Sequence, residues 1–217
     1  MSLSPAPGAA IFDFDGVLID SRAAVAVAVN DALVEHGYAR RPAGTLDFVI
    51  GPPVTTAFAE LTGAPPGSAS VAAAVATYHE HYAAVYLDAT RLVDGIGEAL
   101  DALTLPLALA TSKPVDFVAP LLDRLGIARH FPLVCAPALT ALDEPKALLV
   151  ARALDALGAR DAVVVGDRSF DVEGAHANGL RAIGVTWGIG DAHELEAAGA
   201  DVVVAHPREL PPLLEGR

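Results

Sequence analysis

Two aspartates, Asp13 and Asp15, interrupt an apolar stretch near the start of the chain. The apolar residues before them are few enough for a buried strand, and Gly16 offers a turn directly after them. Side chains two apart in an extended segment point to the same side, so both carboxylates are expected in one pocket at the strand's carboxyl end. Their mutual repulsion is costly unless a cation or a shared proton offsets it. The pattern therefore favours an enzyme with a carboxylate nucleophile, a second carboxyl as acid and base, and a divalent metal.

A cluster of hydroxyl groups lies farther along the chain, after a second short apolar stretch. Thr111, Ser112 and Lys113 follow that stretch, and Pro114 opens a predicted helix. Hydroxyls and backbone N–H groups at a helix start form a natural phosphate cradle. An ordinary capping cluster would use the same residue types, so the residues alone leave both interpretations open.

A lysine and two more aspartates occupy comparable places. Lys146 begins a predicted helix, where the helix dipole disfavours a cation, so stabilisation of the helix does not explain this lysine. Its ammonium in the pocket would instead offset the carboxylates and bind phosphate. A solvated surface lysine is the alternative. Asp167 comes directly after an apolar strand, and Asp171 can share its side of the first helical turn. Such oxygen ligands, with water completing the shell, suit Mg²⁺.

The elements that must position these residues follow a clear order from Gly95 onward. Short apolar strands alternate with helices there, which predicts a parallel sheet covered on both faces. The strands are expected at 107–110, 133–136, 162–165, 182–185 and 202–204, and the helices at 96–103, 115–125, 146–157, 172–178 and 192–198. Ligands of such sheets bind at the carboxyl ends of the strands, so the polar clusters are expected to meet there.

The segment between the first strand and this region is helical in composition, with helices expected at 21–36, 54–62 and 68–87. The expected fold is α/β: a doubly wound parallel-sheet, Rossmann-like core with an inserted α-helical cap domain. The core comprises residues 1–20 and 90–217, and the cap comprises residues 21–89.

Composition and charge exclude several classes of protein. The chain has 217 residues, a net charge of −13 and one cysteine, Cys135. A surface this acidic repels nucleic acid and anionic membranes, so we expect neither as a partner. No apolar run approaches the ~18 residues of a membrane span, and the first residues lack the features of a signal peptide. We expect a cytoplasmic protein; its oligomeric state is left open.

The stretch 13–18, Asp-Phe-Asp-Gly-Val-Leu, followed by Asp20-Ser21, closely resembles the first motif of the haloacid dehalogenase superfamily. Most members of that superfamily are magnesium-dependent phosphohydrolases. Thr111, Lys146 and Asp167 resemble the second, third and fourth motifs, although Pro145 precedes the lysine where many members have a proline after it. The overall pattern is similar to the phosphoglycolate phosphatase-like branch, which carries a helical cap.

This resemblance implies a role for each residue. Asp13 would attack phosphorus, and Asp15 would protonate the leaving alcohol and then deprotonate the attacking water. The substrate phosphate would be bound by Thr111, Ser112 and Lys146. Mg²⁺ would be held by the Asp13 carboxylate, the Asp15 backbone carbonyl and Asp167, while Asp171 would support the metal or Lys146 from beside them.

The implied function is hydrolysis of a small-molecule phosphate monoester, phosphoglycolate-like or a nucleotide, through an aspartyl phosphate. Asp15 argues against a dehalogenase, which lacks that second aspartate. No lysine precedes Lys113, which argues against a phosphonatase and weakens the alternative of a sugar phosphomutase. A phospho-receiver signalling domain is the other alternative. The substrate, the cap residues that select it, and the choice between Lys146 and Lys113 as the phosphate lysine stay open.

Overall fold

The larger of two structural units is built on a six-stranded parallel sheet with the strand order β5-β4-β1-β6-β7-β8. The computed structural model describes the whole chain except residues 1–2, 4, 141–143 and 217. The chain divides into unit 1, Met1–Ile19 with Leu92–Arg217, and unit 2, Asp20–Arg91. The strands of the sheet are β1 Ala9–Phe12, β4 Leu107–Ala110, β5 Leu133–Cys135, β6 Ala162–Gly166, β7 Arg181–Val185 and β8 Val202–Val204.

The strand β1 lies at the centre of this sheet, where the direction of the chain connections reverses. It pairs with β4 on one side and β6 on the other, and all four of its residues are fully buried. Such a switch point is where open α/β sheets bind their ligands. The structure therefore confirms the predicted Rossmann-like sheet, and it places Asp13 directly after the central strand.

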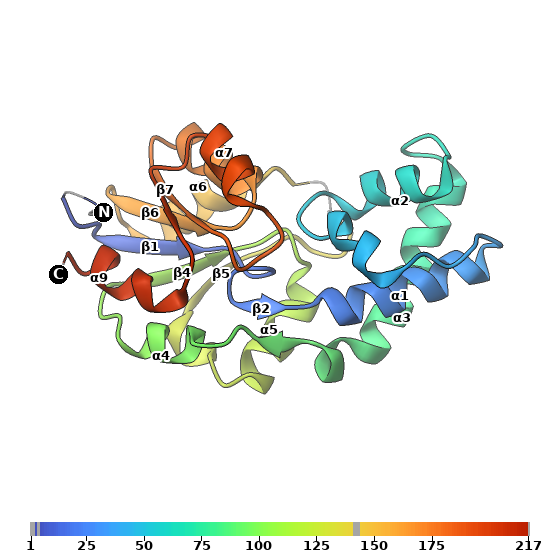
Figure 1. Ribbon diagram of the computed structural model, residues 1–217, viewed down its shortest axis with the longest axis horizontal. Helices are drawn as coiled ribbons and strands as arrows, with labels where there is room; N and C mark the ends of the chain where they lie inside the picture. Colours follow the sequence, from blue (N-terminus) through green and yellow to red (C-terminus); the bar gives the residue numbers. More distant parts are fainter. Residues whose placement is uncertain (1–2, 4, 141–143, 217) are drawn as a thin grey trace. The chain divides into compact units, whose positions relative to one another are not determined.

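Helices cover both faces of the sheet, with α6 and α7 on one side and α4 and α5 on the other (Figure 1). The helices of unit 1 are α4 Ile96–Asp101, α5 Val115–Arg124, α6 Lys146–Leu157, α7 Ser169–Ala177, α8 Ala192–Ala197 and α9 Leu210–Leu214, with short 3₁₀ turns η3 Ala128–His130 and η4 Pro207–Glu209. Alternate β1 residues Ala9 and Ile11 join the buried cluster that also holds Leu149 of α6 and Val172 of α7. A strand buried on both faces explains why its sequence is apolar throughout and does not alternate.

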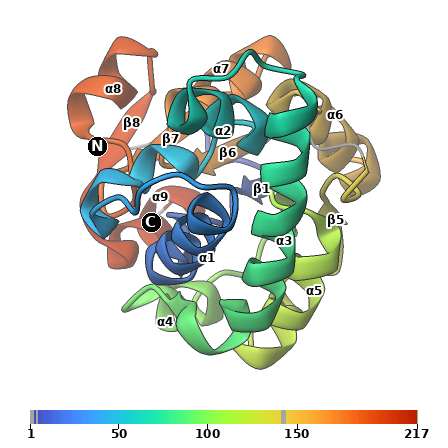
Figure 2. The same ribbon diagram turned by 90° about the vertical axis from the view of Figure 1, so that its right-hand side faces the viewer.

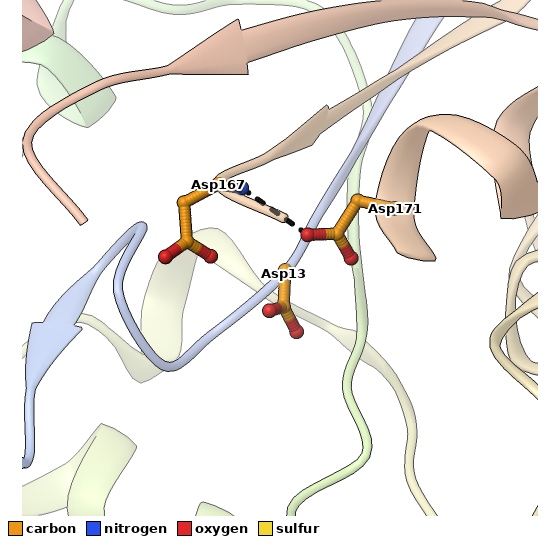
Figure 3. A group of neighbouring side chains, drawn as sticks. All are labelled: Asp13, Asp167 and Asp171. Atoms are coloured by element: carbon orange, nitrogen blue, oxygen red, sulfur yellow. Dashed lines mark hydrogen bonds between the residues drawn. The ribbon is translucent and has the colours of Figure 1, made fainter. Parts of the chain in front are cut away.

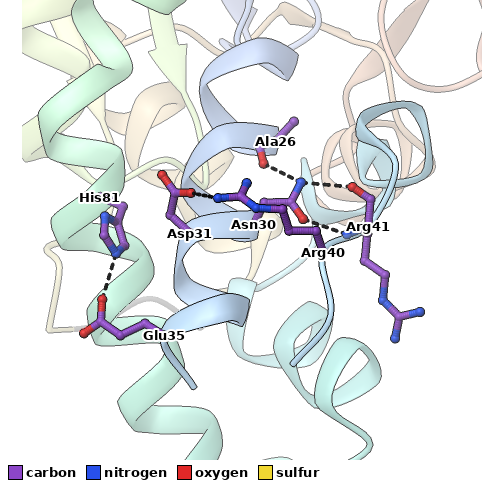
Figure 4. Close-up of polar contacts among 7 residues, drawn as sticks. All are labelled: Ala26, Asn30, Asp31, Glu35, Arg40, Arg41 and His81. Carbon is purple, nitrogen blue, oxygen red and sulfur yellow. Dashed lines mark hydrogen bonds and ion pairs between the residues drawn. The ribbon is translucent and has the colours of Figure 1, made fainter. Parts of the chain in front are cut away.

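Unit 2 contains the helices α1 Arg22–Glu35, α2 Val54–Thr62 and α3 Ala69–Ala89, with 3₁₀ turns η1 Ala43–Thr45 and η2 Asp47–Val49 (Figure 2). The buried side chain of Asn30 in α1 donates to the carbonyls of Ala26 and Arg41 and accepts from the Arg41 N–H (Figure 4). Because both ends of this amide are satisfied, it fixes the chain that leaves α1. Aromatic rings one helical turn apart, Tyr78, Tyr82 and Tyr86, contact each other along α3.

The chain passes between the two units at residues 19–20 and 91–92. The two-residue strands β2 Ile19–Asp20 and β3 Arg91–Leu92 pair with each other at these passages. No helix in the described part of the chain combines the length and the apolar character needed to cross a bilayer.

Candidate active site

Both the backbone and the side chain of Asp13 are fixed by neighbouring elements. Its N–H donates to the Val165 carbonyl of β6 at 2.9 Å, which prolongs the pairing of β1 and β6 by one residue. The carboxylate is buried, and the Lys146 ammonium at the start of α6 lies 2.7 Å from Asp13 Oδ1. The lysine that sequence spacing places at a helix start therefore reaches the first aspartate.

Asp171 connects Lys146 to the loop after β6. Its Oδ2 accepts the backbone N–H groups of Asp167 and Arg168, each at 3.1 Å, while its Oδ1 lies 2.7 Å from Lys146 Nζ. A carboxylate that accepts N–H groups at a helix start caps the helix, and its negative charge interacts favourably with the positive end of the helix dipole. This cap explains why α7 begins at Ser169, three residues earlier than the sequence predicts.

Three carboxylates, from Asp13, Asp167 and Asp171, gather at the ends of β1 and β6 (Figure 3). Each offers one oxygen, and these atoms all lie within 4.8 Å of one another. Burial raises the pKa of Asp13 to about 6, and it raises the pKa of Asp167 well above its ordinary value. Burial alone would lower the pKa of Lys146, but the charges of Asp13 and Asp171 outweigh it and raise that pKa.

The donor set fits a divalent cation. Asp167 is fully buried, and its Oδ1 has no hydrogen-bond partner among the described residues. An ionised oxygen in that position is costly unless a cation compensates it. Asp15 pairs with Lys113, and Asp13 and Asp171 both contact Lys146. Together with Asp167 these groups are four carboxylates and the only two lysines of the chain. The two excess negative charges match one divalent ion, and carboxylate oxygens are ligands that Mg²⁺ prefers.

The structure separates the two lysines that the sequence could not rank. The Lys113 ammonium lies 3.1 Å from both carboxylate oxygens of Asp15, and both side chains are largely buried. The Lys113 N–H donates to Thr111 Oγ1 at 3.1 Å, so the segment after β4 is folded tightly around the hydroxyl. Thr111 is buried, and Ser112 is partly buried. Lys146 is thus the lysine beside Asp13, and Lys113 is the lysine beside Asp15.

Two groups at this site are not predicted from the sequence. One is Lys113 as the partner of Asp15. The other is the Ile189 N–H, which donates to Asp167 Oδ2 at 2.7 Å from the loop after β7. The available signal was a pair of glycines, Gly188 and Gly190, in the loop that follows a predicted strand, which indicates a close approach of the backbone to another group.

Comparison with known proteins assigns the family. The haloacid dehalogenase-like hydrolase family matches residues 10–185. A 5′-nucleotidase of Pseudomonas aeruginosa is 34% identical over 192 residues, which is 86% of this chain and 86% of the relative. The chain therefore belongs to the haloacid dehalogenase-like hydrolases. The sequence prediction of an enzyme of this superfamily is confirmed.

Within that family the chain is similar to phosphatases of the predicted branch. A phosphoglycolate phosphatase of Pectobacterium atrosepticum is 29% identical over 211 residues, 94% of this chain and 90% of the relative. The crystal structure of a predicted phosphatase from Clostridium acetobutylicum superposes with a TM-score of 0.90 at 29% identity, covering 98% of this chain and 100% of that one. A tyrosine-protein kinase, PtkA of Mycobacterium tuberculosis, is 34% identical over 203 residues, 91% of this chain and 68% of the relative.

Proposed function

We propose that the chain is a magnesium-dependent phosphatase that hydrolyses a small-molecule phosphate monoester through an aspartyl phosphate on Asp13. The observation that carries this proposal is that the first two aspartates each contact a different buried lysine, and that Asp13 belongs to a carboxylate cluster that fits a divalent cation. Family membership and relatives named as phosphatases support the same reaction.

In the first step, the Asp13 carboxylate attacks phosphorus and the ester bond to the alcohol breaks, while Asp15 gives its proton to the departing oxygen. In the second step, Asp15 takes a proton from water, and that water attacks the phosphorus of the aspartyl phosphate. The bond between phosphorus and the Asp13 oxygen breaks, which releases inorganic phosphate and restores the Asp13 carboxylate. Thr111, Ser112 and Lys146 stabilise the charge on the phosphoryl oxygens.

Mg²⁺ held by the carboxylates of Asp13 and Asp167 and the Asp15 carbonyl would reduce the repulsion between nucleophile and phosphate. Asp171, whose oxygens are engaged by Lys146 and by the start of α7, supports the lysine and the loop of Asp167. We also propose that unit 2 acts as the cap that chooses the leaving group, since it is inserted directly after the first motif.

A phosphate-release screen across a panel of phosphoglycolate, nucleoside monophosphates and sugar phosphates tests the proposal. We expect many turnovers with Mg²⁺, none with a chelator, and a loss of at least about 10³-fold in kcat in Asp13→Asn, because the carboxylate nucleophile is gone. Asp155→Asn, which alters an exposed carboxylate on α6, serves as the matched control and should match the wild type. An Asp13→Asn variant as fast as the wild type would rule out the assigned nucleophile.

Transfer of phosphate to protein tyrosine is the second candidate, because of the similarity to the relative named as a kinase. Incubation with labelled ATP and a tyrosine-containing peptide separates the two. We expect no label in the peptide and none retained on the chain, because the γ-phosphate of ATP is joined by an anhydride bond and the proposed substrate is a monoester. Label in the peptide would favour the kinase, and a single equivalent retained on the chain without turnover would favour a receiver.

A further inference from the structure

The loop after β7, residues 186–190, makes two contacts with the first and fourth motifs. The Ile189 N–H donates to Asp167 Oδ2 at 2.7 Å. The indole N–H of Trp187, the only tryptophan of the chain, donates to the Val17 carbonyl at 3.0 Å. Val17 lies in the turn that follows Asp15, so the loop is joined to both the Asp15 turn and Asp167.

Glycines surround Asp167 where the loop approaches it. A Cβ at Gly188 would collide with the Asp167 side chain, and a Cβ at Gly190 would collide with the Asp167 carbonyl oxygen. A Cβ at Gly16, in the turn after Asp15, would collide with the same carboxylate. Backbone from two separate segments therefore encloses this aspartate.

The reason for glycine differs among these positions. Gly16 has a φ of 81°, so its backbone conformation favours glycine in any case. Gly188 and Gly190 have φ angles outside the left-handed region, and an alanine could adopt their backbone conformation. At residues 188 and 190, glycine is required because a Cβ has no room next to Asp167.

The enclosure determines which oxygen of Asp167 is available to a ligand. Oδ2 accepts the Ile189 N–H, whereas Oδ1 is buried without a partner among the described residues. A Cβ at residue 188 would collide with Oδ2, Cβ and Cγ of Asp167, so a side chain there would force the carboxylate out of this position.

We propose that the segment Trp187–Gly190 positions Asp167 for the metal, with the Ile189 N–H holding Oδ2 and the glycines admitting the backbone, so that Oδ1 faces the cation. This inference rests on the proposed metal-dependent function. Trp187, Gly188, Ile189 and Gly190 are positioning residues, because they act through Asp167 and through the Asp15 turn.

Calorimetric titration of the full chain with Mg²⁺ alone tests the proposal without using catalysis. Partners that orient a metal ligand typically contribute about 10- to 100-fold in affinity, so Gly188→Ala should raise the Mg²⁺ dissociation constant by that factor. Gly97→Ala is the matched control, because its Cβ would meet only Leu92 of unit 1, at 3.7 Å. An unchanged Mg²⁺ affinity in folded Gly188→Ala, or a wild type that binds no Mg²⁺, would overturn the proposal.

A stability cycle covers the case in which Gly188→Ala folds poorly. Asp167→Gly removes the side-chain atoms with which the new Cβ would collide. Denaturant midpoints of the wild type, both single variants and the double variant should show that Gly188→Ala lowers the midpoint much less in the Asp167→Gly background. Equal losses in both backgrounds would show that Asp167 is not what requires the glycine.

The two proposals fail separately. If Gly188→Ala weakens Mg²⁺ binding but no phosphate ester is hydrolysed, the positioning role stands and the phosphatase does not. If esters are hydrolysed but Gly188→Ala binds Mg²⁺ as the wild type does, the phosphatase stands and the positioning role does not.

Discussion

Two opposing effects act on the pKa of Asp13, and their balance suits the nucleophile and metal ligand that we propose it to be. Burial raises its pKa to about 6, while the Lys146 ammonium at 2.7 Å acts in the other direction. Lys146 in turn lies 2.7 Å from Asp171, so the lysine is shared between two carboxylates. In the proposed reaction, an ammonium fixed in this way is a pre-organised positive charge for the phosphoryl group and needs no rearrangement.

Lys113→Met tests whether Lys113 positions Asp15. The ammonium contacts both oxygens of that carboxylate, so its removal should leave the acid poorly oriented. Since general acids contribute about 10²–10⁴-fold, we expect kcat for an alkyl phosphate to fall by about 10- to 100-fold. The loss should be smaller for p-nitrophenyl phosphate, because p-nitrophenolate leaves without protonation.

Steady-state kinetics on both esters measure this difference, and Lys113→Arg should recover part of the alkyl phosphate activity. If both esters lose the same factor, Lys113 has no specific link to the acid step.

At the scale of elements, the packing of α6 against α7 delivers Lys146 to Asp13. The Asn178 side chain after α7 donates to the Ala147 carbonyl in the first turn of α6 and to the Gly174 carbonyl of α7. A Cβ at Gly174 would lie 3.0 Å from Lys146 Cγ and 3.4 Å from the Lys146 carbonyl carbon. Glycine at this position therefore allows the helices to approach, and the approach places the ammonium.

Gly174→Ala is expected to destabilise the chain, although Gly→Ala inside a helix ordinarily stabilises by about 0.5–1 kcal/mol. Lys146 is fixed by two carboxylates and cannot move aside freely, so we expect a loss of about 1–3 kcal/mol, as in other overpacked sites. Urea unfolding measures the change. The control Gly97→Ala in α4 should be no less stable than the wild type, and a stabilised Gly174→Ala would contradict this view of the α6–α7 contact.

The sequence predicts the elements that have a clear apolar period. The strands β4 and β8 and the helices α2 and α6 have the predicted limits. It does not predict β2 and β3, because two-residue strands have no period to detect. It also does not predict α9, whose prolines at 211 and 212 indicate a break; proline is tolerated in the first turn of a helix, and there they stand.

In the candidate site, too, some features are predicted from the sequence and others are not. The order of the four motifs at strand ends is a property of the sequence, and the sheet brings Asp13, Asp167 and Asp171 together as expected. The partner of Lys113 is decided by how the segment after β4 folds around Thr111, which spacing does not reveal. The need for Gly188 depends on the lack of room for a Cβ beside Asp167, which is a property of the folded chain and not of the spacing of its residues.

At the scale of the whole molecule, the family match at residues 10–185 includes all of unit 2, and the Clostridium structure covers 98% of the chain. The insertion therefore belongs to the fold shared with these relatives. The carboxylate cluster lies wholly in unit 1, and its charge is part of the net charge of −13. The stability of the folded chain should consequently depend on pH and on a cation together.

The last prediction concerns this joint dependence. Burial raises the pKa of Asp13 from 3.8 to about 6 and raises that of Asp167 as well. Between about pH 4 and about pH 6, Asp13 of the metal-free folded chain holds a proton that it has released in the unfolded chain. The raised pKa of Asp167 acts in the same direction. The stabilisation from these groups is therefore present below about pH 4 and is lost as the pH rises through about 6.

Mg²⁺ should reverse this trend, because it binds the ionised carboxylates and competes with protons. Binding to the folded chain at 100 times the dissociation constant adds about 2.7 kcal/mol, or a rise in Tm of roughly 5–10 °C for a chain of this size. Thermal unfolding with a chelator and with Mg²⁺, at about pH 5 and about pH 7.5, measures the effect. We expect the larger rise at the higher pH in the wild type and little rise at either pH in Asp167→Asn. A Mg²⁺ effect that is equal at both pH values would mean that the ion binds elsewhere.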